Sequence, residues 1–100
     1  MDEANARSHI EAHAEAVERG DMEAVVADFT EEMRPQVPEL APQLLPLPIA
    51  NAEVVSVETE GDEAVARIHY TGETGNERTL RSRWREFDGR PLIVGVEPED

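Results

Sequence analysis

Residues 13–29, HAEAVERGDMEAVVADF, contain two helical patterns that meet at Gly20 and Asp21. Apolar residues recur at helical spacing on both sides of this junction. Glycine ends helices because it adopts the left-handed conformation without strain, and an aspartate side chain accepts a hydrogen bond from the first free amides of a helix. The two residues therefore predict a tight corner between two helices whose apolar faces cover one surface.

The two helices extend outward from this corner. The apolar face of the first helix consists of Ala6, Ile10, Ala14 and Val17. Its start stays open between a capping box at Ser8 and an earlier cap at Asp2 or Asn5. The second helix is expected to reach Met33, because one apolar stripe runs through Met22, Val25, Val26, Phe29 and Met33.

A proline-rich connector follows at residues 34–50, RPQVPELAPQLLPLPIA, which hold five of the seven prolines. Proline lacks an amide donor and restrains the residue before it, so a long regular helix and a central strand are excluded. A short helical turn over residues 39–45 stays open. The leucines of the connector predict that it packs on the core and is not a free linker.

The remaining residues favour four strands, at 51–60, 63–71, 77–87 and 90–98, separated by three turn signals with glycine. Short turns require antiparallel neighbours, so we expect a meander. The predicted fold class is α+β, with two N-terminal helices packed on a four-stranded antiparallel meander sheet in a single domain of residues 1–100. The loop at residues 71–77 leaves the register of the middle strands open by one residue.

Composition restricts the possible partners. Twenty-three acidic residues against nine basic residues leave a formal charge of −14, which opposes binding to nucleic acid and to anionic membranes. The absence of cysteine excludes disulfides, a thiolate nucleophile and cysteine-ligated zinc. No apolar stretch approaches the ~20 residues of a membrane span, and the start, MDEANARSH, is acidic and polar where a signal peptide would be basic and apolar. We therefore expect a cytoplasmic protein.

The corner RGDMEAVVADF, and an aromatic strand that runs into an Asp-Gly hairpin in WREFDGRPLIVGV, resemble the nuclear transport factor 2-like superfamily. That superfamily includes SnoaL-like polyketide cyclases and ketosteroid isomerases. The resemblance implies a cystatin-like cone, truncated in this chain because the connector replaces the further strands and third helix that wall the family's pocket. It therefore implies a small or open pocket, which makes an enzyme less expected.

Site residues can be compared through the same resemblance. It implies that His13 replaces the catalytic tyrosine of the isomerases, Val37 the general-base aspartate, and Arg83 the protonated aspartic acid. None of these groups is kept, so isomerase chemistry is not expected. His13 lies at the edge of the apolar stripe, where an imidazole could act as an acid, a base or a hydrogen-bond donor. The simpler interpretation is a structural histidine at the rim of the core.

Metal binding is weighed from the histidines. His9 and His13 are four residues apart on one helix, a spacing that lets two imidazoles approach one ion. A third ligand would have to come from His69 or a carboxylate, and HIEAH differs from the zinc-protease motif in the place of its glutamate. We expect no metal and no cofactor. Asp28 is expected to point sideways, toward solvent or an arginine.

The third strand has two chemically distinct faces. Arginines alternate on one face and are joined by an arginine of the neighbouring strand; this arginine row consists of Arg67, Arg81, Arg83 and Arg85. Three interpretations stay open: an anion-binding surface, a dimer surface, or pairing with Glu53, Glu58 and Glu86. We favour the last two together. On the opposite face Trp84 is expected to meet the helices, either filling the core or lining a pocket with Tyr70 and Ile68.

Three classes of function stay open. We favour a homodimeric, non-catalytic domain that binds a small apolar or acidic molecule or a protein partner. Its candidate ligand-binding residues are Phe29, Ile68, Tyr70 and Trp84. The alternatives are a cyclase, isomerase or dehydratase that uses His13 with a carboxylate, and a structural or interaction protein. The sequence does not identify a substrate.

Overall fold

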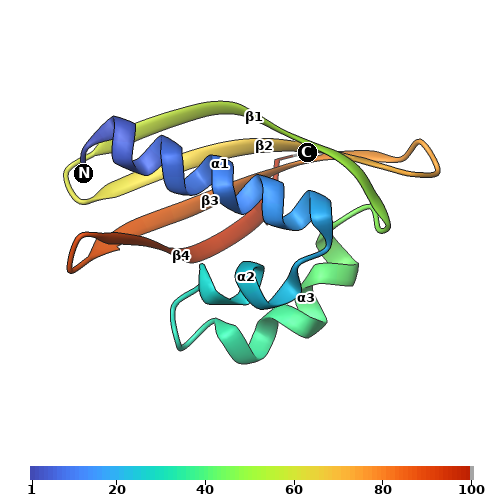
Figure 1. Cartoon of the computed structure of the whole chain (residues 1–100), viewed down its shortest axis with the longest axis horizontal. Coiled ribbons are helices and arrows are strands. Elements are labelled where there is room, and N and C mark those ends of the chain that lie inside the picture. The colour runs from blue at the N-terminus through green and yellow to red at the C-terminus, as the bar shows by residue number, and fades with distance from the viewer. Residues whose placement is uncertain (100) are drawn as a thin grey trace.

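The computed structural model describes residues 1–99 and places all helices before all strands (Figure 1). The helical elements are α1 (Glu3–Arg19), α2 (Met22–Ala27), the 3-10 turn η1 (Arg34–Gln36) and α3 (Val37–Leu44). The strands are β1 (Ile49–Glu60), β2 (Glu63–Gly72), β3 (Glu77–Phe87) and β4 (Arg90–Pro98). They form one antiparallel sheet in the order β1-β2-β3-β4. The predicted α+β class and the meander are confirmed.

The helical corner forms as predicted. Gly20 has φ 75°, and the chain turns there through a hydrogen bond from its amide to the Val17 carbonyl at 3.1 Å. Asp21 then caps α2, because its Oδ1 accepts from the Ala24 amide at 3.2 Å. At the other end of α1, the Asp2 carboxylate caps the helix, so the earlier of the two possible starts is the correct one.

The second helix is shorter than predicted. α2 ends at Ala27, and the following backbone leaves the helix to pair with β4. The Ile93 amide donates to the Asp28 carbonyl at 2.7 Å, and the Thr30 amide donates to the Ile93 carbonyl at 3.1 Å. The expected helical stripe to Met33 is therefore wrong in its extent, since sheet pairing satisfies these backbone groups instead.

The proline-rich connector is mostly helical. Pro35 and Pro38 occupy the first turns of η1 and α3, where a helix does not need the missing amide donor. Val37 is buried, and Leu44 and Leu45 pack against the core. The connector thus packs on the core as predicted, with its helix beginning two residues earlier than the expected turn.

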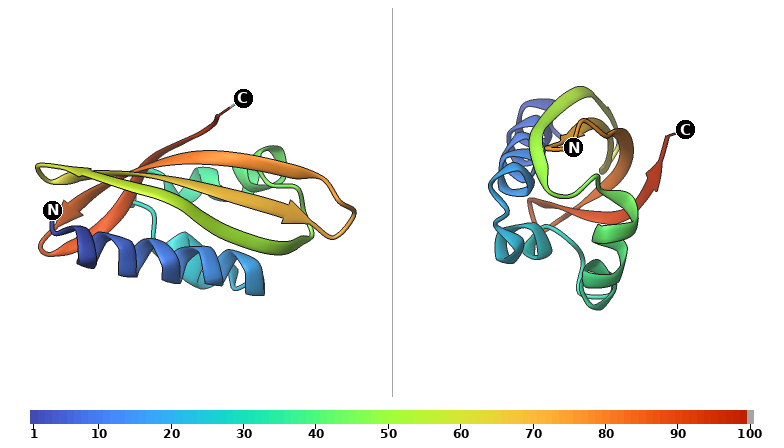
Figure 2. Two further views of the ribbon diagram at one scale, coloured as in Figure 1. Left: turned by 90° about the horizontal axis from the view of Figure 1, so that it is seen from above. Right: turned by 90° about the vertical axis from the view of Figure 1, so that its right-hand side faces the viewer.

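The helices lie on one face of the sheet, called here the inner face. α1 runs along this face, while α2 and α3 lie beyond it on the β4 side (Figures 1 and 2). The bulkiest fully buried side chains, Trp84, Ile10, Ile68 and Ile93, come from both layers. No helix within residues 1–99 is long and apolar enough to cross a membrane.

The structure defines the register of β2 and β3, which the sequence left open by one residue. Ile68 lies opposite Leu80, and Arg67 lies opposite Arg81. Ile68 and Leu80 are buried on the inner face, whereas the two arginines share the outer face. This register places the arginine row on the outer face, away from the helices, and directs Trp84 toward the helices, as expected.

Candidate functional site

A small cavity lies between the helices and the inner face of the sheet. Its volume is about 50 Å³, room for only a few water molecules, and it is partly open to solvent. Its lining is mainly apolar, with α3 contributing Leu40, Ala41 and Leu44. The polar side chains on the lining are His13, Tyr70 and Ser82. A small or open pocket is what the short connector led us to expect.

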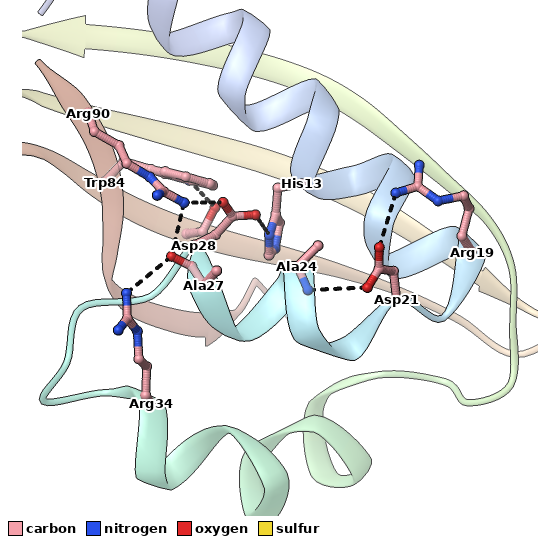
Figure 3. Close-up of polar contacts among 10 residues, drawn as sticks. His13, Arg19, Asp21, Ala24, Ala27, Asp28, Arg34, Trp84 and Arg90 are labelled. Atoms are coloured by element: carbon pink, nitrogen blue, oxygen red, sulfur yellow. Dashed lines mark hydrogen bonds and ion pairs between the residues drawn. The ribbon is translucent and has the colours of Figure 1, made fainter.

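His13 connects this cavity to a carboxylate. The residue is 5% exposed, and its Nδ1 lies 2.9 Å from Oδ2 of Asp28, the residue that caps the end of α2 (Figure 3). Trp84 and Phe29 meet the imidazole edge-on, with ring centroids 5.4 and 6.1 Å away. The imidazole is therefore held on one side by a charged hydrogen bond and on two others by aromatic rings.

Arginines hold the segment that carries Asp28. The Arg90 guanidinium donates to the Ala27 carbonyl at 3.1 Å and to Asp28 Oδ1 at 3.4 Å. Arg34 donates to the Phe29 carbonyl at 3.0 Å and reaches the same Ala27 carbonyl at 3.4 Å (Figure 3). Cationic donors at the end of a helix satisfy its last carbonyls and suit its dipole. The Asp28 carboxylate thus has a fixed position from which it orients His13.

Asp28 was expected to contact solvent or an arginine, and its carboxylate contacts Arg90. Its contact with His13 was missed, although the sequence holds a signal for it. His13 stands seven residues before Gly20, and Asp28 stands seven residues after Asp21. Two helices that fold back at a tight corner bring residues at equal distances from the corner near one another.

Two polar atoms of cavity-lining residues have no hydrogen-bond partner among residues 1–99: His13 Nε2 and the Tyr70 hydroxyl. In this part of the chain no fully buried polar side-chain atom lacks a hydrogen bond, so both atoms keep some access to solvent. Tyr70 is 3% exposed, and burial raises the pKa of its phenol well above the usual range. The phenol therefore stays protonated. The third polar group, Ser82 Oγ, accepts from Trp84 Nε1 at 2.9 Å.

The predicted ligand-binding residues separate into two groups. Phe29, Ile68 and Tyr70 line the cavity, together with Val37. Trp84 does not line it: the indole is 0% exposed and packs behind His13. Of the two open interpretations for Trp84, filling the core is therefore the one observed.

The arginine row lies on the outer face and is largely paired. Hydrogen bonds from Arg67 to Glu99 raise the arginine's pKa and lower that of the carboxyl. The other pairs are Arg85 with Glu63 at 2.8 Å and Arg81 with Glu97 at 3.6 Å. Of the predicted partners, Glu58 is close enough for its charge to raise the pKa of Arg67, although it forms no direct ion pair. Glu53 and Glu86 are wrong, because the register sets Glu63 opposite Arg85 and Glu97 opposite Arg81.

Arg83 differs from the rest of the arginine row. It has no acidic partner within the described part of the chain, and its guanidinium extends over Gly95 of β4. This outer position separates it from the cavity. The correspondence with the isomerases' protonated aspartic acid therefore does not bring Arg83 to the site.

The three histidines do not converge. His9 Nδ1 contacts the Asn5 carbonyl at 3.0 Å on α1. His69 contacts Thr79 and Glu77 at 2.9 and 2.8 Å, on the face opposite His13. Over residues 1–99 no three histidine or carboxylate side chains gather in a way that could hold a metal ion.

Comparisons with known proteins identify a solved structure with a similar fold. No protein-family model matches the sequence, and no curated protein matches it. The fold is similar to the solution structure of a SEC-C motif containing protein from Rhodopseudomonas palustris, with a TM-score of 0.65 over 92% of this chain and 77% of that one. The sequences are 17% identical, so the likeness concerns the α+β fold alone.

Proposed function

We propose that this domain binds a small apolar molecule in the cavity, with His13 contacting the molecule's polar group. The observation that carries the proposal is a pair of unpartnered polar atoms, His13 Nε2 and the Tyr70 hydroxyl, on a mainly apolar lining. Apolar pockets with a few convergent polar groups are the usual form of small-molecule sites. Because the cavity is small, only a small molecule or one end of a larger one enters it.

Membership of the nuclear transport factor 2-like superfamily is part of this proposal. Its support is the order of the elements, the helical corner at Gly20 and Asp21, and the position of His13 on the cavity. In relatives a catalytic tyrosine takes the place that His13 would occupy. The shortened connector accounts for a cavity much smaller than a substrate-sized pocket.

Binding is tested by nuclear magnetic resonance titration of the full chain with cyclopentanol, whose hydroxyl end is small enough to enter the cavity from its open side. We expect saturable shifts at His13, Val17 and Tyr70, which line the cavity. Ala41→Phe places a ring in the cavity and should abolish them. Ala50→Phe is the matched control, because Ala50 is exposed on β1 and does not line the cavity. Shifts that are absent, or that survive Ala41→Phe, would contradict the proposal.

A second candidate, proton transfer to or from the bound molecule, is favoured by the 2.9 Å contact between His13 and Asp28. A carboxylate on Nδ1 fixes the imidazole tautomer, which leaves Nε2 to exchange a proton with a ligand. The test is hydrogen–deuterium exchange next to the carbonyl of cyclopentanone. We expect acceleration by the native chain and its loss in Asp28→Asn. No acceleration would leave binding as the only function proposed.

A further inference from the structure

We infer that the cavity selects a neutral hydroxyl group, so that its ligand is an apolar alcohol and not a carboxylate or another anion. This inference rests on the proposed binding function and narrows it to a ligand class. It also chooses between the apolar and acidic ligands that the sequence left open.

The first argument is the proton on His13. The Asp28 carboxylate can only accept hydrogen bonds, so Nδ1 must carry the proton in their 2.9 Å contact. In a neutral imidazole the other nitrogen, Nε2, then presents a lone pair. On the His13 side the cavity therefore offers a hydrogen-bond acceptor, and a ligand must bring a donor.

The second argument is the phenol of Tyr70. It remains neutral at ordinary pH, so its hydroxyl can donate to a ligand oxygen. An alcohol hydroxyl has the two functions that these groups call for, because it can donate to an acceptor such as Nε2 and accept from a donor such as the Tyr70 hydroxyl. An ether or ketone oxygen satisfies Tyr70 only. A hydrocarbon satisfies neither.

The third argument is the absence of a cation on the described lining. Arg78, which contacts the end of α3, donates to the carbonyls of Gln43 and Leu44 at 2.9 and 3.4 Å. Arg34 and Arg90 are likewise committed to the end of α2. An anion would lose its hydration in an apolar cavity without a cationic partner. The chain's charge of −14 adds to this penalty.

The test compares three ligands built on one ring: cyclopentanol, cyclopentyl methyl ether and cyclopentanecarboxylate. Dissociation constants are measured by nuclear magnetic resonance on the unaltered full chain at neutral pH. We expect the alcohol to bind about 3- to 10-fold more tightly than the ether, the usual effect of one neutral hydrogen bond. The carboxylate should bind roughly tenfold more weakly than the alcohol, or not at all, because it has no cationic partner.

The outcomes separate the inference about the ligand class from the proposed binding function on which it rests. Equal affinity for alcohol and ether, or strongest binding of the carboxylate, overturns the inference and leaves the binding function in place. Binding of none of the three overturns both. Tyr70→Phe keeps the ring and should weaken alcohol and ether alike by about 3- to 10-fold. Should that variant fold poorly, the ligand comparison on the unaltered chain still decides.

Discussion

The two faces of the sheet are built from the same strands, yet they satisfy polar groups in opposite ways. On the outer face, charged side chains pair with each other in solvent, as Arg67 does with Glu99 and Arg85 with Glu63. On the inner face, His13 and Tyr70 are buried and leave one polar atom each on a cavity. Exposed ion pairs contribute little to stability, whereas a buried polar atom needs a partner. Stability therefore depends chiefly on the inner face, which also carries the proposed binding site.

The largest expected effect contrasts two neighbours on β3. Trp84→Ala removes a fully buried ring from the inner face and should lower the free energy of unfolding by about 3–5 kcal/mol. Arg83→Ala, which changes the exposed outer face, should alter it by no more than about 0.5 kcal/mol. Denaturant unfolding followed by circular dichroism measures both. Similar losses of unfolding free energy in the two variants would contradict the expected difference between the faces.

A second pair compares glycines on the two faces. A Cβ at Gly72, on the inner face, would collide with the backbone carbonyl of Pro46, so Gly72→Ala should cost about 1–3 kcal/mol. A Cβ at Gly95 would stand 2.9 Å from the end of the flexible Arg83 side chain, which can move. Gly95→Ala should leave the melting temperature nearly unchanged. If Gly72→Ala were equally harmless, the connector would not be tightly packed on the sheet.

The third prediction concerns alkaline pH. Because burial raises the pKa of Tyr70, the unfolded chain loses the phenolic proton first, and stability falls as pH rises above about 10. The chain has no lysine or cysteine and only one tyrosine, so few other groups titrate there. Tyrosinate absorbance and thermal melts at several pH values measure the effect. Tyr70→Phe should flatten this part of the stability profile, and an unchanged slope would contradict the burial argument.

The smallest effect on stability is expected on the outer face. Homodimerisation there stays a prediction, and Arg83 is its best probe, since this residue has no acidic partner within residues 1–99. Arg83→Glu should leave the fold intact and delay elution from a sizing column if two copies pair through this face. An elution volume equal to that of the native chain would count against the interface.

Local signals in the sequence accounted for most of the fold. Gly20 and Asp21 each have one suitable conformation at a helix junction, and the three turn signals set off four strands close to their observed bounds. The length of α2 was wrong because its end depends on pairing between residues 28–30 and β4, which are distant in sequence. The helical pattern of the sequence does not indicate that pairing with β4 competes with a longer α2.

The candidate site was only partly predictable. Phe29, Ile68, Tyr70 and Trp84 were predicted to bind a ligand and His13 to act as an acid or base, and all of these except Trp84 line the cavity. The contact between His13 and Asp28 was missed because the orientation of Asp28 depends on where α2 ends. Most of the outer ion pairs were also misassigned, since Arg81 pairs with Glu97 of β4 and Arg67 with Glu99 just after it, and residue patterns within single strands do not indicate these cross-strand contacts.

The edge-on contact between His13 and Trp84 links the fluorescence of the indole to the charge of the imidazole. Trp84 is the single tryptophan, and the two rings meet at 85° with centroids 5.4 Å apart. A charged imidazole at this range withdraws electrons from an excited indole and quenches its emission. We therefore expect the intrinsic fluorescence to fall when His13 gains a proton, and a molecule that changes this protonation to alter the emission without a label.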